Sequence, residues 1–162
     1  MRIFISHKSE DVGLAKHYAE DLSKLDFDYY LDEYDIHIKN SSDRGSLINN
    51  EIKKSTDLLV IVSENTKKSW WVPFEIGLST AANNRIVTIV HDGAPELPSF
   101  LRKWPVIDTD EKYQTYLSEL EINNRKLIAE SKQFSKSMES IFKSNNSADI
   151  FHSNLINKFS RL

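Results

Sequence analysis

Residues 57–63 are the segment that most restricts how this chain can fold. Between Asp57 and Ser63 every residue is Leu, Val or Ile, so the segment has no polar face to turn toward water. A strand that is apolar on both faces is typical of the interior of a parallel sheet that helices cover on each side. We therefore expect residues 57–63 to form a central strand.

Short strands and amphipathic helices alternate around this segment. Further strands are predicted at residues 3–6, 27–31, 85–91 and 106–107. Two of the helices between them are predicted from apolar residues at helical spacing. The first carries Ala15, Tyr18, Leu22 and Leu25 on one face. The second is capped by Ser46 and carries Leu47, Ile48 and Ile52. The alternation predicts an α/β fold, an open parallel five-stranded sheet with helices on both faces.

A third predicted helix carries a carboxylate on its apolar face. Pro73 favours the first turn of a helix, because its missing N–H costs little there. The inward stripe of a helix running to about residue 82 would hold Trp71, Phe74, Glu75, Leu78 and Ala82. No cationic residue stands one turn before or after Glu75. Burying a carboxylate is costly and shifts its pKa, and such groups concentrate at functional sites. The alternative is that Glu75 stands at the edge of the stripe and its carboxylate reaches water.

Open parallel sheets bind their ligands at the carboxyl ends of the strands. The predicted ends in this chain lie at residues 6–8, 32–33, 63–65 and 91–92. Several familiar chemistries are excluded there. The four glycines are spread along the chain, so neither a P-loop nor a dinucleotide fingerprint exists, and the G-x-S-x-G elbow of serine hydrolases is absent. A phospho-receiver needs an acidic cluster after its first strand, where this chain has Ser6 and His7.

The composition limits the classes of binding partner and the cellular compartment that we expect. The chain has no cysteine, and its five histidines show no metal-ligand spacing, so no metal site is expected. A formal net charge of −3 gives no argument for nucleic acid binding. The longest apolar run, residues 58–62, is far too short to span a membrane, and the first residues do not read as a signal peptide. We expect a cytoplasmic protein with no membrane or nucleic acid partner.

Two blocks of sequence resemble a known family. Residues 3–11, Ile-Phe-Ile-Ser-His-Lys-Ser-Glu-Asp, look like the opening strand and loop of Toll/interleukin-1 receptor (TIR) domains. Residues 56–65, followed by Ser69-Trp70-Trp71 and then Glu75, are similar to the third strand of that family and the helix after it. The resemblance implies a flavodoxin-like TIR domain over residues 1–120, with a C-terminal helical extension over residues 121–162. The polar segment 32–45 would correspond to the family's loop over the ligand cleft.

The resemblance also implies an activity. Many bacterial and plant TIR domains cleave NAD at the nicotinamide–ribose bond with a glutamate at the position that Glu75 matches. Nicotinamide leaves without a general acid, so the barrier lies in the oxocarbenium-like ribose, which one nearby carboxylate can stabilise. NAD would then be the substrate, and no cofactor is implied. The product (ADP-ribose, a cyclic isomer or a transfer product) stays open. The implied setting is bacterial antiphage defence, in which an ADP-ribose-derived signal acts on a separate effector.

Further residues are candidates for binding NAD on the same resemblance. They are Phe4, Ser6, His7 and Lys8 near the cleft, Asp32 and Arg44 at the two ends of the polar loop, and Trp71 one turn before Glu75. Lys8 could meet the diphosphate, and Trp71 offers a flat surface for a ring or else packs in the core. Arg44 is a solvated surface residue in the alternative interpretation. Two other functions stay open: a non-catalytic TIR adaptor that acts by self-association, and an N-glycosidase similar to nucleoside deoxyribosyltransferases.

The last third of the chain departs from this pattern, with neither Pro nor Gly after Pro105. A seam of alternating four- and three-residue spacing comprises Tyr113, Leu117, Leu120, Asn124, Leu127, Ser131, Phe134, Met138 and Ile141. Residues 145–147 are predicted to break it before a short final helix that carries Phe151, Leu155 and Phe159. The seam either docks on the chain's own domain or forms a self-association surface, and in the second case Asn124 would set the register.

Overall fold

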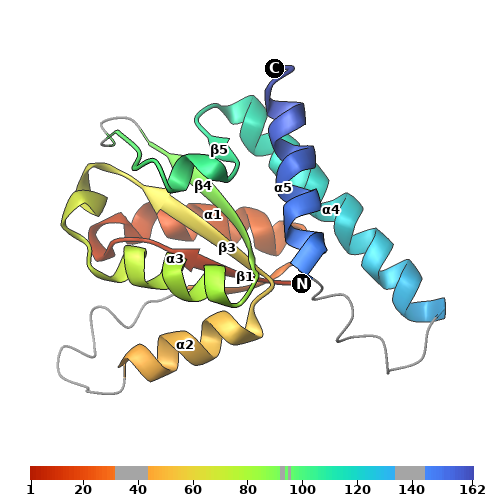
Figure 1. The fold of residues 1–162 in the computed structure, drawn as a ribbon, viewed down its shortest axis with the longest axis horizontal. Coiled ribbons are helices and arrows are strands. Elements are labelled where there is room, and N and C mark those ends of the chain that lie inside the picture. The colour runs from red at the N-terminus through yellow and green to blue at the C-terminus, as the bar shows by residue number, and fades with distance from the viewer. Residues whose placement is uncertain (32–43, 92–93, 95, 134–144) are drawn as a thin grey trace.

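The computed structural model describes residues 1–31, 44–91, 94, 96–133 and 145–162 (Figure 1). Five strands form one sheet in the order β2-β1-β3-β4-β5, and every neighbouring pair is parallel. The strands are β1 (Arg2–Ser6), β2 (Asp28–Leu31), β3 (Asp57–Val62), β4 (Arg85–Val90) and β5 (Val106–Ile107). The predicted α/β fold is confirmed, and β3 is buried along its whole length as its composition requires.

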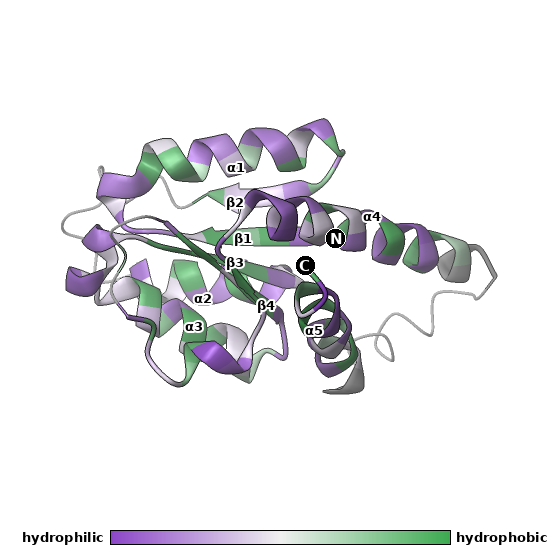
Figure 2. Ribbon diagram, turned by 90° about the horizontal axis from the view of Figure 1, so that it is seen from above, coloured by the Kyte–Doolittle hydropathy of each residue, from purple (hydrophilic) through white to green (hydrophobic). Residues whose placement is uncertain are grey.

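Helices cover both faces of the sheet (Figures 1 and 2). They are α1 (Val12–Lys24), α2 (Arg44–Lys54), α3 (Trp71–Ala81), α4 (Asp110–Gln133) and α5 (Asn145–Phe159), with the short 3-10 helices η1 (Ser9–Asp11), η3 (Glu64–Lys68) and η4 (Leu101–Lys103). One core lies between the sheet and α1, α4 and α5, and the other lies between the sheet and α2 and α3. The period of two along β1 divides its side chains, because Ile3 and Ile5 enter the first core and Phe4 enters the second.

The buried faces of α2 and α3 differ from the prediction. Helix α2 begins at Arg44, not after Ser46, and Leu47 is 38% exposed while Ile48 and Ile52 are buried. Position 47 is about 100° around the helix from position 48, so Leu47 falls on the flank of the buried face.

Helix α3 is rotated by about one residue from the predicted orientation. Its buried residues are Val72, Glu75, Ile76 and Ser79. Phe74 is 42% exposed, and Trp71 and Leu78 are only partly buried. Glu75 belongs to both the predicted and the observed face, and it is 2% exposed. The alternative in which its carboxylate reaches water is therefore wrong.

The described part of the C-terminal region packs on the chain's own domain. Tyr113, Leu117 and Leu120 of α4 are buried in the same core as the sheet, together with Phe151, Leu155 and Phe159 of α5. Asn124 and Leu127 are partly buried. The side chain of Ser131, and Phe134, Met138 and Ile141, lie outside the described residues. Docking on the same chain thus accounts for the described half of the seam, and self-association stays a prediction.

Two predicted boundaries in the C-terminal region, at residues 145–147 and at residue 120, can be compared with the helices. Residues 145–147 form the first turn of α5 and are not a break, which agrees with the preference of Asn and Ser for helix starts. Helix α4 runs without interruption through residue 120, and the division of the chain there stays a prediction.

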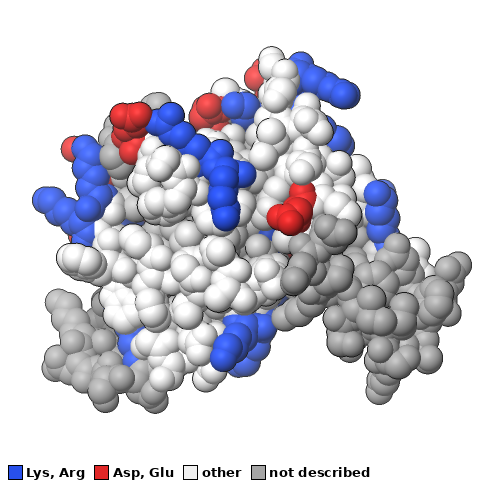
Figure 3. Space-filling view, viewed as in Figure 1, with Lys and Arg blue, Asp and Glu red and all other residues white. Residues whose placement is uncertain are grey.

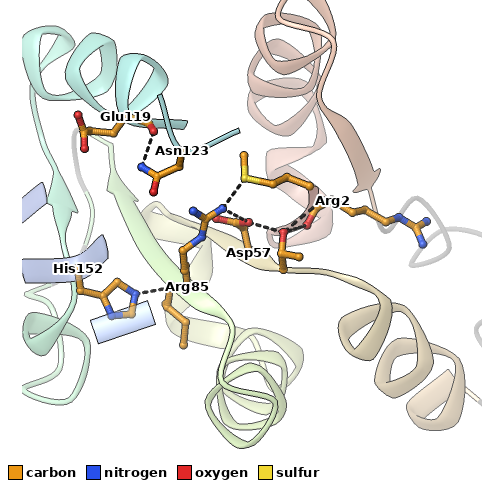
Figure 4. Close-up of polar contacts among 9 residues, drawn as sticks. Arg2, Asp57, Arg85, Glu119, Asn123 and His152 are labelled. Atoms are coloured by element: carbon orange, nitrogen blue, oxygen red, sulfur yellow. Dashed lines mark hydrogen bonds and ion pairs between the residues drawn. The ribbon is translucent and has the colours of Figure 1, made fainter. Parts of the chain in front are cut away.

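Helix α5 completes the edge of β4 where β5 does not reach. Strand β5 pairs with Thr88 and Ile89 of β4. Nearer the start of β4, the backbone N–H of Ile86 donates to Nε2 of His152 at 2.8 Å (Figure 4). His152 is 7% exposed, and burial lowers its pKa to about 4, so near neutral pH the ring is uncharged and can accept this bond.

A buried ion pair lies beside this contact, at the amino ends of β3 and β4 (Figure 4). Nη2 of Arg85 is 2.7 Å from Oδ2 of Asp57, and the Arg85 guanidinium lies 4.4 Å from the centroid of the Phe151 ring. Lys158 of α5 donates to the buried Glu119 of α4. Helix α5 is thereby tied to both the sheet and α4 by charged groups as well as by apolar contacts.

Charged side chains are dispersed over one face of the molecule. On the face drawn in Figure 3, Lys and Arg side chains are scattered around the margin among Asp and Glu, and most of the centre carries no charge. Among the described residues, this face therefore has no large basic patch. In the parts of the chain that the structure describes, every helix is too short or too polar to cross a membrane.

Candidate functional site

Ser6 and Glu75 meet at the carboxyl end of β1. Ser6 is the last residue of the strand and, like Phe4, it points to the side of the sheet that α3 covers. Its hydroxyl donates to Oε2 of Glu75 at 2.5 Å. Both residues are buried, with exposures of 0% for Ser6 and 2% for Glu75. A short hydrogen bond from a hydroxyl fixes the orientation of the carboxyl group, so one oxygen of Glu75 is committed to the protein.

Trp71 and Arg44 stack one turn away from Glu75. The Arg44 guanidinium lies 4.1 Å from the centroid of the Trp71 ring, within the range of a cation–π contact. Phe74 meets the same ring edge-on, with the centroids 5.7 Å apart. Arg44, the first residue of α2, is partly buried by this contact and is more than a solvated surface residue. One face of Trp71 is therefore occupied by Arg44, and a ligand ring would need the other face or would have to displace the guanidinium.

The turn after β1 carries His7 and Lys8. His7 is 6% exposed, and its Nδ1 lies 3.3 Å from the carbonyl oxygen of Ile5. Lys8 is partly exposed, and its Nζ lies 3.7 Å from a carboxylate oxygen of Glu10. The hydrogen bond from Ser9 is the main cause that lowers the pKa of Glu10, and the charge of Lys8 acts in the same direction. An ionised, exposed carboxylate thus stands beside Lys8, and an anionic ligand would compete with it for the ammonium group.

The other predicted site residues are placed as follows. Phe4 is 0% exposed, and its ring centroid lies 5.1 Å from that of Tyr30, so it forms part of the core beneath Ser6. Asp32 lies outside the described residues. The substrate-binding roles of Phe4, Ser6, His7, Lys8, Asp32, Arg44 and Trp71 stay predictions.

The end of β4 contributes to the opposite face of the sheet. His91 follows β4, and its Nε2 lies 2.8 Å from the hydroxyl oxygen of Tyr18 on α1. Burial is the main cause that raises the pKa of Tyr18. The carboxyl edge of the sheet therefore has a Ser6–Glu75 pair on one face and a Tyr18–His91 pair on the other.

Sequence reasoning missed Asp11, a buried carboxylate at the same edge. Asp11 is 4% exposed and accepts hydrogen bonds from Ser63 and Asn65, which follow β3. The position of Asp11 just before a predicted helix indicates only that it could cap that helix. Its partners are more than fifty residues away, and no local pattern points to them.

The family assignment follows from a comparison with protein-family models. The model of the TIR domain matches residues 3–121, which is well over half of the chain. The chain belongs to the TIR domain family. A search of curated proteins finds no match. The matched part of the TIR domain starts in β1 and ends within α4, so it contains Ser6, Asp11 and Glu75 and leaves α5 outside.

The TIR domain thus presents the oriented, buried carboxylate of Glu75 at the edge where ligands of parallel sheets bind, with both oxygens of the second buried carboxylate there, Asp11, bound by Ser63 and Asn65. Among the described residues, no three His, Asp or Glu side chains come together in a way that could hold a metal ion. Such a carboxylate can stabilise a developing positive charge, and burial strengthens that interaction because the local dielectric is low.

Proposed function

We propose that this TIR domain cleaves the nicotinamide–ribose bond of NAD, with Glu75 as the catalytic carboxylate. The observation that carries the proposal is the placement of Glu75, which is 2% exposed and bound by the Ser6 hydroxyl at 2.5 Å at the carboxyl edge of the sheet. Burying an acid costs folding free energy, and its presence on the buried face of α3 is explained if that acid does chemistry.

The reaction needs little from the protein besides positioning and charge. The bond between ribose C1′ and the pyridinium nitrogen breaks, and its electron pair neutralises nicotinamide as it leaves. Positive charge then develops on the ribose ring, where the carboxylate of Glu75 would stabilise it. Attack by water at C1′ and loss of one proton give ADP-ribose, whereas attack by a nucleophile within the same molecule gives a cyclic isomer. A different acceptor would give a transfer product.

The proposed biological setting extends this chemistry. We propose that the protein acts in the cytoplasm as part of bacterial antiphage defence, and that its ADP-ribose-derived product is sensed by a separate effector. Self-association through TIR surfaces or through the C-terminal helices is proposed as a way to control the activity. These proposals rest on the family membership and on the buried carboxylate of Glu75.

The test compares two buried glutamates in the full chain. Purified protein is incubated with NAD, and nicotinamide and the other products are resolved by mass spectrometry. Glu75→Gln preserves the shape of the side chain and removes its charge, so it should slow nicotinamide release by about 10²-fold or more. The matched control is Glu119→Gln, which changes a buried glutamate that pairs with Lys158 on the other side of the sheet. Its turnover should stay within about twofold of wild type, since Glu119 contacts neither Glu75 nor any of the candidate NAD-binding residues.

Other results would point to the remaining functions. A folded Glu75→Gln variant that turns over NAD at the wild-type rate would remove Glu75 from the mechanism. Turnover of nucleosides without turnover of NAD would identify a deoxyribosyltransferase-like N-glycosidase. A wild-type chain that associates with itself and releases no nicotinamide would identify an adaptor.

A further inference from the structure

One buried carboxylate joins the turn after β1 to the turn after β3. Oδ2 of Asp11 accepts a hydrogen bond from the Ser63 hydroxyl at 2.6 Å, and Oδ1 accepts one from Nδ2 of Asn65 at 2.7 Å. The backbone N–H of Asn65 in turn donates to the Ser63 hydroxyl at 3.0 Å. The two turns, separated by more than fifty residues in sequence, are thereby held in one hydrogen-bonded unit.

The arrangement is unusual for an aspartate at this position. Asp11 stands at the N-cap of α1, where an aspartate ordinarily accepts hydrogen bonds from the first backbone N–H groups of its own helix. Its side chain makes no capping bond in α1. Asp11 is also the last residue of η1, which runs directly into α1, and both of its carboxylate oxygens are used for the contact with the β3 side. The side chain of Asp11 therefore serves the contact between the two turns and not the start of its own helix.

The two turns are those that carry the candidate site. The backbone N–H of Asp11 donates to the carbonyl oxygen of Lys8 at 2.7 Å, so Asp11 also closes the turn that presents Lys8. Ser63 begins the segment that leads through η3 to α3 and Glu75. The Ser6–Glu75 bond connects the same two parts of the chain, with the hydroxyl on the β1 side and the carboxylate on the α3 side. Asp11 and Ser63 form a second such link, in which the carboxylate is on the β1 side and the hydroxyl is on the α3 side.

We propose that Asp11 is a positioning residue for the anionic part of the substrate. It holds the turn with His7 and Lys8 in a fixed place relative to the start of α3, so that the ammonium group of Lys8 is presented to a diphosphate. The inference rests on the proposed NAD cleavage. Asp11 itself does not act on the reacting bond in this account, because both of its oxygens are already engaged by Ser63 and Asn65.

The kinetic signature of this role differs from that of Glu75. A contact between Lys8 and the diphosphate is the same before and during bond cleavage, so its loss raises KM and leaves kcat nearly unchanged. Asp11→Asn keeps the shape of the side chain but removes its charge and replaces one acceptor oxygen by an amide donor. We expect KM for NAD to rise about tenfold or more, as for a lost charge-assisted hydrogen bond, with kcat within about threefold of wild type. Amide hydrogen exchange should become faster in residues 8–11 and 63–66.

The experiment includes a second variant and a matched control. Asn65→Ala removes one of the two bonds from the other side, so it should raise KM less than Asp11→Asn and accelerate exchange in the same two turns. Asp57→Asn changes another buried carboxylate of the same sheet, which pairs with Arg85 at the opposite end of β3. It should lower the melting temperature while leaving KM for NAD unchanged.

The outcomes separate this inference from the proposed function. Unchanged KM together with unchanged exchange in both Asp11→Asn and Asn65→Ala would overturn it, as would a fall in kcat with constant KM. If the wild-type chain releases no nicotinamide, the proposed function fails. Hydrogen exchange in the two turns then decides alone whether Asp11 holds them together.

Discussion

Acidification should destabilise this TIR domain through His152, a residue outside the part that the family model matches. In the folded chain, Nε2 of His152 accepts the backbone N–H of Ile86, so the ring must be neutral. Burial is the main cause that lowers the pKa of His152 from 6.5 to about 4. The charged groups around the ring are Asp149, Arg85, Asp57 and Lys103, of which the two carboxylates raise the pKa and the two cations lower it.

The sign and size of the effect follow from proton linkage. In the unfolded chain His152 takes up its proton near pH 6.5, whereas in the folded chain it does so only near pH 4. Between these values the unfolded state binds more protons, so stability is complete above pH 6.5 and is lost as the pH falls toward 4. The difference between a pKa of 6.5 and one of about 4 corresponds to about 3 kcal/mol. This is a large part of the roughly 5–15 kcal/mol that stabilises a typical domain.

The assay is urea unfolding at a series of pH values between 7 and 4, with His152→Gln as the reference. Glutamine can place an acceptor oxygen near the position of Nε2 and does not titrate, so the carboxylates contribute equally to both proteins. The wild-type protein should lose about 3 kcal/mol more than the variant over this range. Equal losses in the two proteins would refute the reasoning, and so would a pKa near 6.5 for His152 in a histidine NMR titration of the folded chain.

Two further predictions concern packing. Leu155→Ala on α5 empties a site that is 0% exposed and should lower the free energy of unfolding by about 2–5 kcal/mol in urea titrations, whereas Ile150→Ala at a 57% exposed position of the same helix should cost far less. Equal costs for the two variants would contradict the docking of α5. Trp71→Ala should lower stability by less than the ~3–5 kcal/mol of a fully buried tryptophan, because the ring is only partly buried. A raised KM for NAD would add a ligand contact, and an unchanged melting temperature with unchanged kinetics would exclude both roles for Trp71.

Local sequence patterns were sufficient to predict the strands and the burial of the Glu75 carboxylate. The burial of β3 could be predicted from its unbroken run of aliphatic residues, and the burial of Glu75 from the apolar residues beside it in the sequence. The face that α3 buries could not be read in this way. Trp71, Phe74 and Leu78 form one apolar stripe, while Val72 and Ile76 form another beside it. Both fit a helix, and the choice between them depends on packing against α2 and β3.

The contacts that sequence reasoning missed are those between distant segments. Asp11 and Ser63 are 52 residues apart, and Ile86 and His152 are 66 residues apart. An isolated aspartate before a helix reads as a cap, and an isolated histidine reads as a surface residue. The partner of the seam on α4 could not be predicted either, because heptad spacing fits a helix docked on its own sheet as well as a helix paired with a second chain.

The bond between Ile86 and His152 also bears on the order in which the chain folds during synthesis. Helix α5 is the last of the described elements to leave the ribosome, yet it covers the start of β4 and supplies Phe151, Leu155 and Phe159 to the core. Until it emerges, the nascent chain exposes an apolar face and an unpaired backbone donor on β4, which are the features that promote association between incomplete chains. Translation pauses before α5 emerges would lengthen that interval, and chaperones that bind nascent chains would have their largest effect there.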